Sequence, residues 1–166
     1  PVNDRTALVS SNDSVKLVDA LKGLFQDGGQ LSKQYKEGHM GYASGFEFAE
    51  STHLSTQTRG SGASYVLNDA SIADGDTVVT VGTGTGTANA GEIFTIADVY
   101  SVHPETKVST GVLKQFVVVS LSGTTLTFSP AWQSTGATQN VNALPVTTAA
   151  VTIAGTASTN YGQSMV

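Results

Sequence analysis

The three histidines are the first residues to weigh for chemistry, because imidazole binds metals and transfers protons near neutral pH. His39, His53 and His103 have no second ligand in the spacing of a protein metal site. His53, three residues after Glu50, is the strongest candidate, but a solvent-facing histidine is the more common role. The sequence therefore predicts no metal site at these positions.

Two loop-like motifs match known ligand sites only in part. Asp69, Asp74 and Asp76 lack the further alternate ligand and the terminal glutamate of a calcium loop, so the Asp-Gly-Asp run is interpreted as a turn. The run VGTGTGT (81–87) lacks the spacing and the lysine of a phosphate-binding loop, and a strand follows it. We interpret residues 82–89 as a flexible connection.

No pairing of nucleophile and base is visible in the sequence. Serines are numerous, but none lies in a G-x-S-x-G elbow. Glu47 and Glu50 are three residues apart on an expected strand, so their carboxylates point to opposite faces. The chain has no cysteine, which excludes thiol catalysis and thiolate metal ligands. We therefore expect no catalytic residue, no cofactor and no enzymatic activity.

Trp132 and Tyr100 are the aromatic residues that could stack on a sugar or a base. With these two platforms the chain would be a β-rich ligand-binding or carbohydrate-binding adhesin module. Alternatively, Trp132 closes one end of a small barrel, which is the more common role for such a residue. Both interpretations stay open at this point.

Composition and charge narrow the choice of partners. Only 13% of the 166 residues are charged, against about a quarter in typical soluble domains. Residues 63–166 carry two Lys/Arg and six Asp/Glu, so they cannot neutralise a phosphate backbone, and we expect no specific nucleic-acid partner. No apolar run approaches the ~20 residues that span a bilayer, so we expect no membrane partner.

The first sixty residues predict two helices and a strand. Apolar residues recur at steps of three and four from Val15 to Phe25, which predicts a helix over about 13–27, capped by Asn12 or Asp13. A second helix is expected over about 30–37. The run GFEFAES (45–51) alternates phenylalanine with glutamate and predicts a strand over about 45–50.

After residue 62 the helical period gives way to short β-branched runs divided by Gly and Asp. The clearest pair is FVVVSLSGTTLTFSP (116–130), in which Ser122-Gly123 supplies the turn of a hairpin. The runs predict a small antiparallel barrel or sandwich. The fold class is thus mainly β with an N-terminal α-helical segment (α+β). The runs are SYVLND, DTVVTV, EIFTIADVY, LKQFVVVSL, TTLTFSP and AAVTIAG.

The run HPETKVSTG (103–111) raises a separate question. It places Glu105 and Lys107 at one reversal between two strands, with Lys114 just beyond, although the chain has few charges. A plain reversal needs only two residues of the Asn-Gly or Gly-Ser type.

Several long runs together resemble one protein family. They include LVDALKGLFQ (17–26), GFEFAES (45–51), HPETKVSTG (103–111) with VLKQFVVVSL (112–121), and GTTLTFSPAW (123–132). In these runs the chain resembles the major coat protein of tailed phages, commonly carried as prophages, of the phage P-twenty-two type. The resemblance covers almost the entire chain.

The resemblance implies a capsid protein of the HK-ninety-seven fold with a small antiparallel β-barrel inserted into a fragment of its axial domain. Residues 1–62 would belong to the axial domain, 63–145 to the inserted barrel, and 146–166 to the return into the axial domain. The chain would then be an internal fragment, without the N-terminal arm, the spine helix and the C-terminal region of such a protein.

The same resemblance implies a function. The protein would be a structural virion protein, located in the capsid and assembled in the bacterial host cytoplasm. Its partners would be further copies of itself in the shell and a scaffolding protein during assembly. The charges at the reversal, His103, Glu105, Lys107 and Lys114, would then contact a neighbouring subunit, whereas otherwise they belong to a solvated loop.

Overall fold

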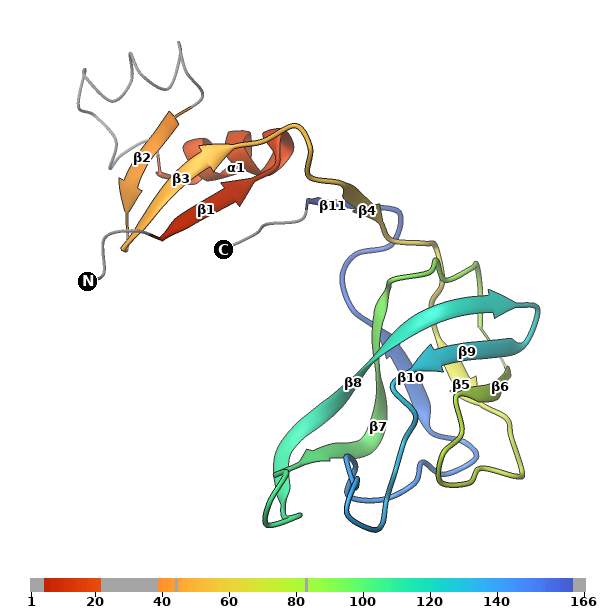
Figure 1. Cartoon of the computed structure of the whole chain (residues 1–166). Coiled ribbons are helices and arrows are strands. Elements are labelled where there is room, and N and C mark those ends of the chain that lie inside the picture. The colour runs from red at the N-terminus through yellow and green to blue at the C-terminus, as the bar shows by residue number, and fades with distance from the viewer. Residues whose placement is uncertain (1–4, 22–38, 44, 83, 163–166) are drawn as a thin grey trace. The chain divides into compact units, whose positions relative to one another are not determined.

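The structure is a computed structural model that describes residues 5–21, 39–43, 45–82 and 84–162 (Figure 1). The chain forms two compact units. The first, the helix unit, consists of Pro1–Gln57 and Asn160–Val166, and the second, the barrel unit, is Thr58–Thr159. The assignment of chain segments to capsid domains stays a prediction.

The helix unit contains a three-stranded sheet and one described helix. The sheet order is β1-β3-β2, formed by β1 (Thr6–Val9), β3 (Phe46–Glu50) and β2 (His39–Ala43). β1 runs parallel to β3, and β2 runs antiparallel to it. A separate two-stranded sheet pairs β4 (Thr56–Thr58) with β11 (Asn160–Gly162).

The helix α1 (Ser11–Leu21) begins earlier than the sequence pattern predicts. Ser10 caps it: the Ser10 hydroxyl donates to the Asp13 carboxylate (3.0 Å) and accepts from the Asp13 backbone N–H (3.3 Å). The Ser10 side chain thus accepts from the third backbone N–H of the helix, as an N-cap does, so the expected caps at Asn12 or Asp13 were wrong. The predicted remainder of this helix and the helix at 30–37 lie outside the described residues.

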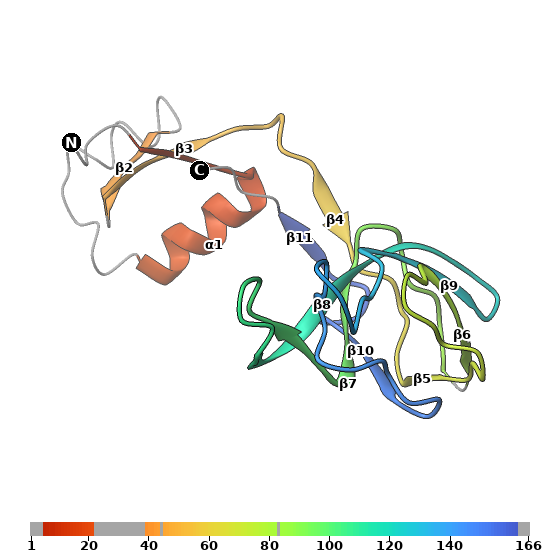
Figure 2. The ribbon, with the colours of Figure 1, turned by 60° about the horizontal axis from the view of Figure 1, so that its bottom comes forward.

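The barrel unit is a closed six-stranded antiparallel barrel (Figures 1 and 2). The order around it is β10-β5-β6-β9-β8-β7, and the pairing of β7 with β10 closes it. Each of the six β-branched runs supplies one strand, which confirms the mainly β class and the small barrel. The strands are β5 (Tyr65–Leu67), β6 (Val78–Gly82), β7 (Ile93–Val102), β8 (Ser109–Ser122), β9 (Thr125–Ser129) and β10 (Ala150–Ile153).

The barrel extends beyond residue 145, where the sequence interpretation ended it. Val151 on β10 pairs with Tyr65 on one side and with Ile96 on the other. Val151 and Ile153 are buried, whereas Ala150 and Thr152, which alternate with them, are exposed. This period-two alternation, together with the two pairings, places residues 150–153 in the barrel wall.

The β8–β9 hairpin forms at the predicted place. Ser122 pairs with Thr125 across the Gly123-Thr124 turn, and Gly123 has φ +61°. A glycine adopts this left-handed conformation at little cost. The turn therefore lies one residue further along than Ser122-Gly123, and the predicted hairpin is confirmed.

Aromatic side chains fill the barrel core. Phe94, Phe116 and Phe128 have ring centroids 5.6–5.9 Å apart, and all three are buried. Full burial of each such side chain stabilises the fold by roughly 1.5–3 kcal/mol. The strand alternation that turns these rings inward therefore supplies much of the core.

Candidate interaction surface

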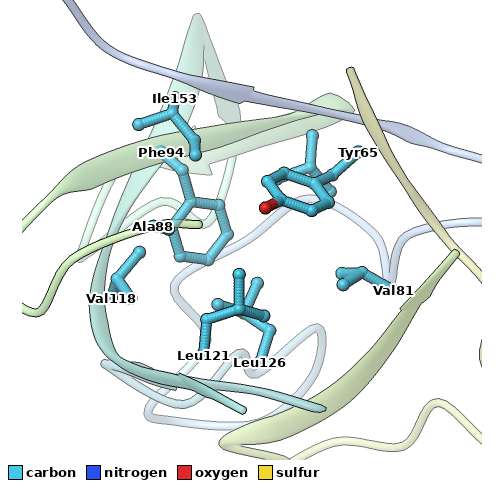
Figure 3. Close-up of a pocket in the computed structure, with 9 residues that line it drawn as sticks. Tyr65, Val81, Ala88, Phe94, Val118, Leu121, Leu126 and Ile153 are labelled. Atoms are coloured by element: carbon cyan, nitrogen blue, oxygen red, sulfur yellow. The ribbon is translucent and has the colours of Figure 1, made fainter. Parts of the chain in front are cut away.

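The barrel interior has no room for a small molecule. Its internal pocket has a volume of about 10 Å³ and an apolar lining, whereas ligand sites typically measure about 300–1,000 Å³. Figure 3 shows Tyr65, Phe94 and Leu126 among the side chains that fill this space. The barrel is therefore a packed core and not a binding cup.

Trp132 is part of this core. It is 0% exposed, it packs against Phe128 with a centroid distance of 4.6 Å, and its indole N–H donates to the carbonyl of Ala73 (2.8 Å). The interpretation of Trp132 as a sugar platform was wrong, because no face of the ring reaches solvent. Tyr100 is half-buried on β7, where its backbone N–H donates to the side chain of Asn142 (2.6 Å).

The reversal between β7 and β8 is a structured turn. The His103 N–H donates to the carbonyl of Val108 and the Lys107 N–H to the carbonyl of His103, both at 2.9 Å. The His103 Nδ1 accepts from the backbone N–H groups of Glu105 (3.3 Å) and Thr106 (3.4 Å). His103 therefore shapes the turn, and Glu105 at its tip is exposed.

Lys107 and Lys114 are brought together by the fold. Both line an open pocket of about 320 Å³ between the β7–β8 hairpin and residues 137–140. The ammonium group of Lys107 donates to the carbonyl of Ala137 (2.7 Å). His103 and Glu105 are not among the lining residues. We call this feature the lysine pocket; it is lined by Val102, Pro104, Lys107, Lys114, Ala137, Thr138, Gln139 and Asn140.

Hydrogen bonds hold the far wall of the lysine pocket in place. The Asn140 side chain accepts from the Gln133 N–H (2.9 Å) and donates to the carbonyl of Ala131 (2.8 Å). The Gln139 side chain donates to the carbonyl of Val141 (3.1 Å). Val141 is buried and forms a bridge to β7. Residues 137–140 therefore form a fixed wall of the pocket, opposite the hairpin.

The acidic residues 69–76 form turns. The carboxylate of Asp69 accepts from the backbone N–H groups of Ser71 (3.0 Å) and Thr80 (3.1 Å), which lowers its pKa. The carboxylate of Asp74 accepts from the backbone N–H of Ser134 (2.6 Å), and this bond lowers its pKa. These contacts support the interpretation of the acidic run as a turn.

The described part of the chain contains no metal-binding cluster and no membrane-spanning helix. There, no three His, Asp or Glu side chains gather closely enough to hold a metal ion. Likewise, no helix within those residues has the length and apolarity to cross a bilayer.

Sequence patterns did not point to Arg59, which is buried at one end of the barrel. Its side chain is 6% exposed, and its guanidinium donates to carbonyls of two chain segments: the segment entering the barrel and the segment leaving it. We call residues 58–62 and 153–159 the neck. The acceptors are the carbonyls of Gly60 (3.0 Å), Gly62 (2.9 Å), Ala154 (3.1 Å) and Ile153 (3.5 Å).

Glu92 is buried beside the neck. It is 4% exposed; its Oε1 accepts from the Gly60 N–H, and its Oε2 has no hydrogen-bond partner among the described residues. The Tyr65 hydroxyl donates to the carbonyl of Gly86 (2.7 Å). Burial, together with the charge of Glu92, raises the pKa of Tyr65. A buried charged group of this kind is unusual without a structural role.

The glycine-threonine run is a fixed partner of the neck and not a loose loop. Ala63 and Thr85 exchange two backbone hydrogen bonds of 3.0 Å, and the Gly62 N–H donates to the carbonyl of Thr87 (2.8 Å). A Cβ on Gly60 would overlap the carbonyl oxygen of Thr87. The expectation of a flexible connection was therefore wrong for residues 84–89. The alternate glycines of RGSG and GTGTG were the sequence signal for this close approach.

An open pocket of about 440 Å³ lies between β5 and β10 beside Arg59. The guanidinium reaches this pocket with most of its N–H groups already bonded to carbonyls. An anion in this pocket would therefore find few free N–H donors on Arg59.

Comparisons with known proteins show similarity to solved structures and to no family model or curated protein. Among solved structures, the chain is similar to the CUS-3 coat protein I-domain, with 33% sequence identity and a TM-score of 0.40. The match covers 60% of this chain and 95% of that domain. In sequence, and over nearly the full length of that domain, the chain is therefore similar to a coat protein I-domain.

Proposed function

We propose that the chain is part of the major coat protein of a tailed phage and has a structural, not a catalytic, role. The observation that carries this proposal is the 33% sequence identity over 95% of a coat-protein I-domain. The long runs around residues 17–26 and 103–121, which resemble coat proteins of the phage P-twenty-two type, support it. The packed barrel interior, with only about 10 Å³ of free volume, agrees with a building module.

In this proposal the barrel is inserted into the axial domain of an HK-ninety-seven-like shell protein. The protein assembles with copies of itself in the host cytoplasm, with a scaffolding protein as a partner, and remains in the virion. The barrel stabilises the subunit, and the β7–β8 reversal contacts a neighbour through His103, Glu105, Lys107 and Lys114. One exposed charge pair contributes only ~0–1 kcal/mol, but symmetry repeats it in every subunit.

Expression of the full-length coat protein tests this proposal, with electron microscopy as the readout. We expect closed particles from the unchanged protein. Reversal of the two turn charges, Glu105→Lys with Lys107→Glu, should produce misassembled shells or shells of altered size. Normal particles from this double variant would contradict the contact role, and a protein that never forms particles would contradict the shell role.

A matched control keeps the net charge and the turn and introduces a pair of opposite charges elsewhere on β8. Gln115 and Ser120 are exposed on β8, away from the reversal. The variant Gln115→Lys with Ser120→Glu adds one charge of each sign there. We expect it to assemble as the unchanged protein does, because it leaves the turn intact.

A further inference from the structure

Both lysines of the barrel unit lie at one place. Between Thr58 and Thr159 the sequence has three Lys/Arg residues and six Asp/Glu residues. Arg59 is buried, and backbone carbonyls accept its hydrogen bonds. The other two cations, Lys107 and Lys114, line the same pocket, and no carboxylate is among the lining residues. An anionic group near this acidic unit is therefore attracted to the lysine pocket.

The lysine pocket is preformed. Lys107 is bonded to the carbonyl of Ala137, and the wall at Asn140 is fixed by hydrogen bonds to Ala131 and Gln133. A preformed site loses little conformational entropy when it binds. Its volume of about 320 Å³ suits one or two side chains of a partner.

An exposed apolar residue precedes the pocket lysine on β8. Val112 is 64% exposed and lies two residues before Lys114. Val108, near the turn, is 65% exposed. Valines beside lysines match a partner that carries aliphatic side chains between its carboxylates, as an extended acidic polypeptide can.

The acidic run of a second copy is poorly suited to this role. Asp69, Asp74 and Asp76 already accept hydrogen bonds within their own chain. If such a carboxylate instead contacted a neighbouring copy, it would lose these hydrogen bonds. That loss would offset part of the free energy of the new contact. Residues 69–76 of a second copy are therefore a poor occupant, and an acidic segment whose carboxylates are not already bonded suits the pocket better.

We propose that the lysine pocket, together with Val112 on the same strand as Lys114, binds an extended acidic segment of a different polypeptide through carboxylates at Lys107 and Lys114. This goes beyond the subunit contact proposed above, because it gives the two lysines a partner that is not a copy of this chain. The binding assay below uses the 166-residue chain without shells, so its failure leaves the particle assay and the shell role intact.

The probe is a fluorescently labelled hexapeptide of alternating Glu and Val, titrated against the full chain with anisotropy as the readout. The matched control peptide has Gln in place of each Glu. We expect the acidic peptide to bind and the Gln peptide to bind at least about fivefold more weakly, because two exposed charge pairs are lost. Raising the salt from about 0.05 M to about 0.5 M should weaken the acidic peptide selectively.

Variants of the chain locate the binding site. Lys114→Gln leaves the bond between Lys107 and Ala137 in place, so it tests charge without loosening the pocket wall. We expect it to weaken the acidic peptide about two- to fivefold, and Lys107→Gln with Lys114→Gln to weaken it further. Lys16→Gln removes one exposed charge from α1 and should leave binding unchanged.

Three outcomes would overturn the proposal. The first is equal binding of the Glu and Gln peptides, and the second is equal binding by the unchanged chain and the double lysine variant. The third is self-association of the unchanged chain in sedimentation that the double variant abolishes while the acidic peptide does not compete. That result would assign the pocket to a second copy.

Discussion

The guanidinium of Arg59 donates a hydrogen bond of 3.1 Å to the carbonyl of Ala154, a residue 95 positions further along the chain. Other N–H groups of the same side chain donate to Gly60 and Gly62, next to Arg59 itself. One buried side chain therefore joins the segment that enters the barrel to the segment that leaves it. The base of the barrel is closed by this tie as well as by strand pairing.

Loss of Arg59 should destabilise the barrel. Arg59→Met leaves several buried carbonyls without a donor, and we expect the free energy of unfolding to fall by about 2–4 kcal/mol. Urea unfolding followed by tryptophan fluorescence measures this change, because Trp132 lies in the barrel core. The control is Lys16→Met on exposed helix surface. A loss in Arg59→Met as small as in the control would show that the tie is dispensable.

The close approach of the neck and the glycine-threonine run predicts a strong effect at Gly60. In Gly60→Ala the new Cβ overlaps the Thr87 carbonyl, and we expect a loss above about 3 kcal/mol or failure to fold. Gly136→Ala is the control: its Cβ meets open space, and only the φ of +83° costs about 1–2 kcal/mol. Thermal melting of both variants gives the comparison. Equal melting temperatures of the two variants would show that the neck and the glycine-threonine run do not pack closely at Gly60.

The barrel unit should fold alone only if β10 is present. A chain of residues 58–159 keeps all six strands and the neck, so we expect one cooperative transition. A chain of residues 63–145 lacks β10 and leaves β5 and β7 with open edges, so we expect it to bind a hydrophobic dye and to melt broadly. Calorimetry and dye fluorescence distinguish the two. Cooperative melting of 63–145 would show that closure by β10 is not required.

Acid should loosen the turn that contains Asp74 before the core unfolds. The Asp74 pKa is lowered because the charged carboxylate accepts the Ser134 N–H bond. The stabilisation from this bond is complete above the ordinary carboxyl pKa of about 3.9 and is lost as the pH falls through the lower, folded pKa. NMR titration of the Ser134 amide follows this loss, and Asp74→Asn should remove the pH dependence. An amide signal that titrates equally in both proteins would exclude Asp74 as its cause.

Trp132 should matter for stability and not for sugar binding. Trp132→Ala leaves a cavity among the core phenylalanines, and we expect a loss of about 3–5 kcal/mol. Denaturant unfolding, monitored by circular dichroism, measures this loss of stability. On a glycan array the unchanged chain should show no binding that depends on Trp132. A sugar signal abolished by this substitution in a folded variant would revive the adhesin interpretation.

Prediction from sequence succeeded where the determinant is local. The six β-branched runs and the turn at Gly123 depend on side chains near in sequence, so the strands and the β8–β9 hairpin could be predicted. The cap of α1 failed by a few residues, since Ser10, Asn12 and Asp13 are all residue types that cap helices. The interpretation of residues 82–89 failed because its glycines serve a contact with residues 60–63, more than twenty positions away.

The candidate interaction surface also combines features that the sequence could predict with features that it could not. The sequence showed that charged residues cluster at the reversal between β7 and β8. It did not show the pocket that joins Lys107 and Lys114, because this pocket also needs residues 137–140 from another loop. Arg59 and Glu92 gave no sequence signal, since an isolated charged residue is usually exposed.

By itself, the sequence determined the strand-forming segments, the low charge and the resemblance to coat proteins, because alternation and composition act over a few neighbouring residues. Only the tertiary structure decided that β10 closes the barrel, that Trp132 is core, and that Arg59 ties the neck. Each of these depends on contacts between residues distant in sequence, and burial is decided by everything that packs around a side chain.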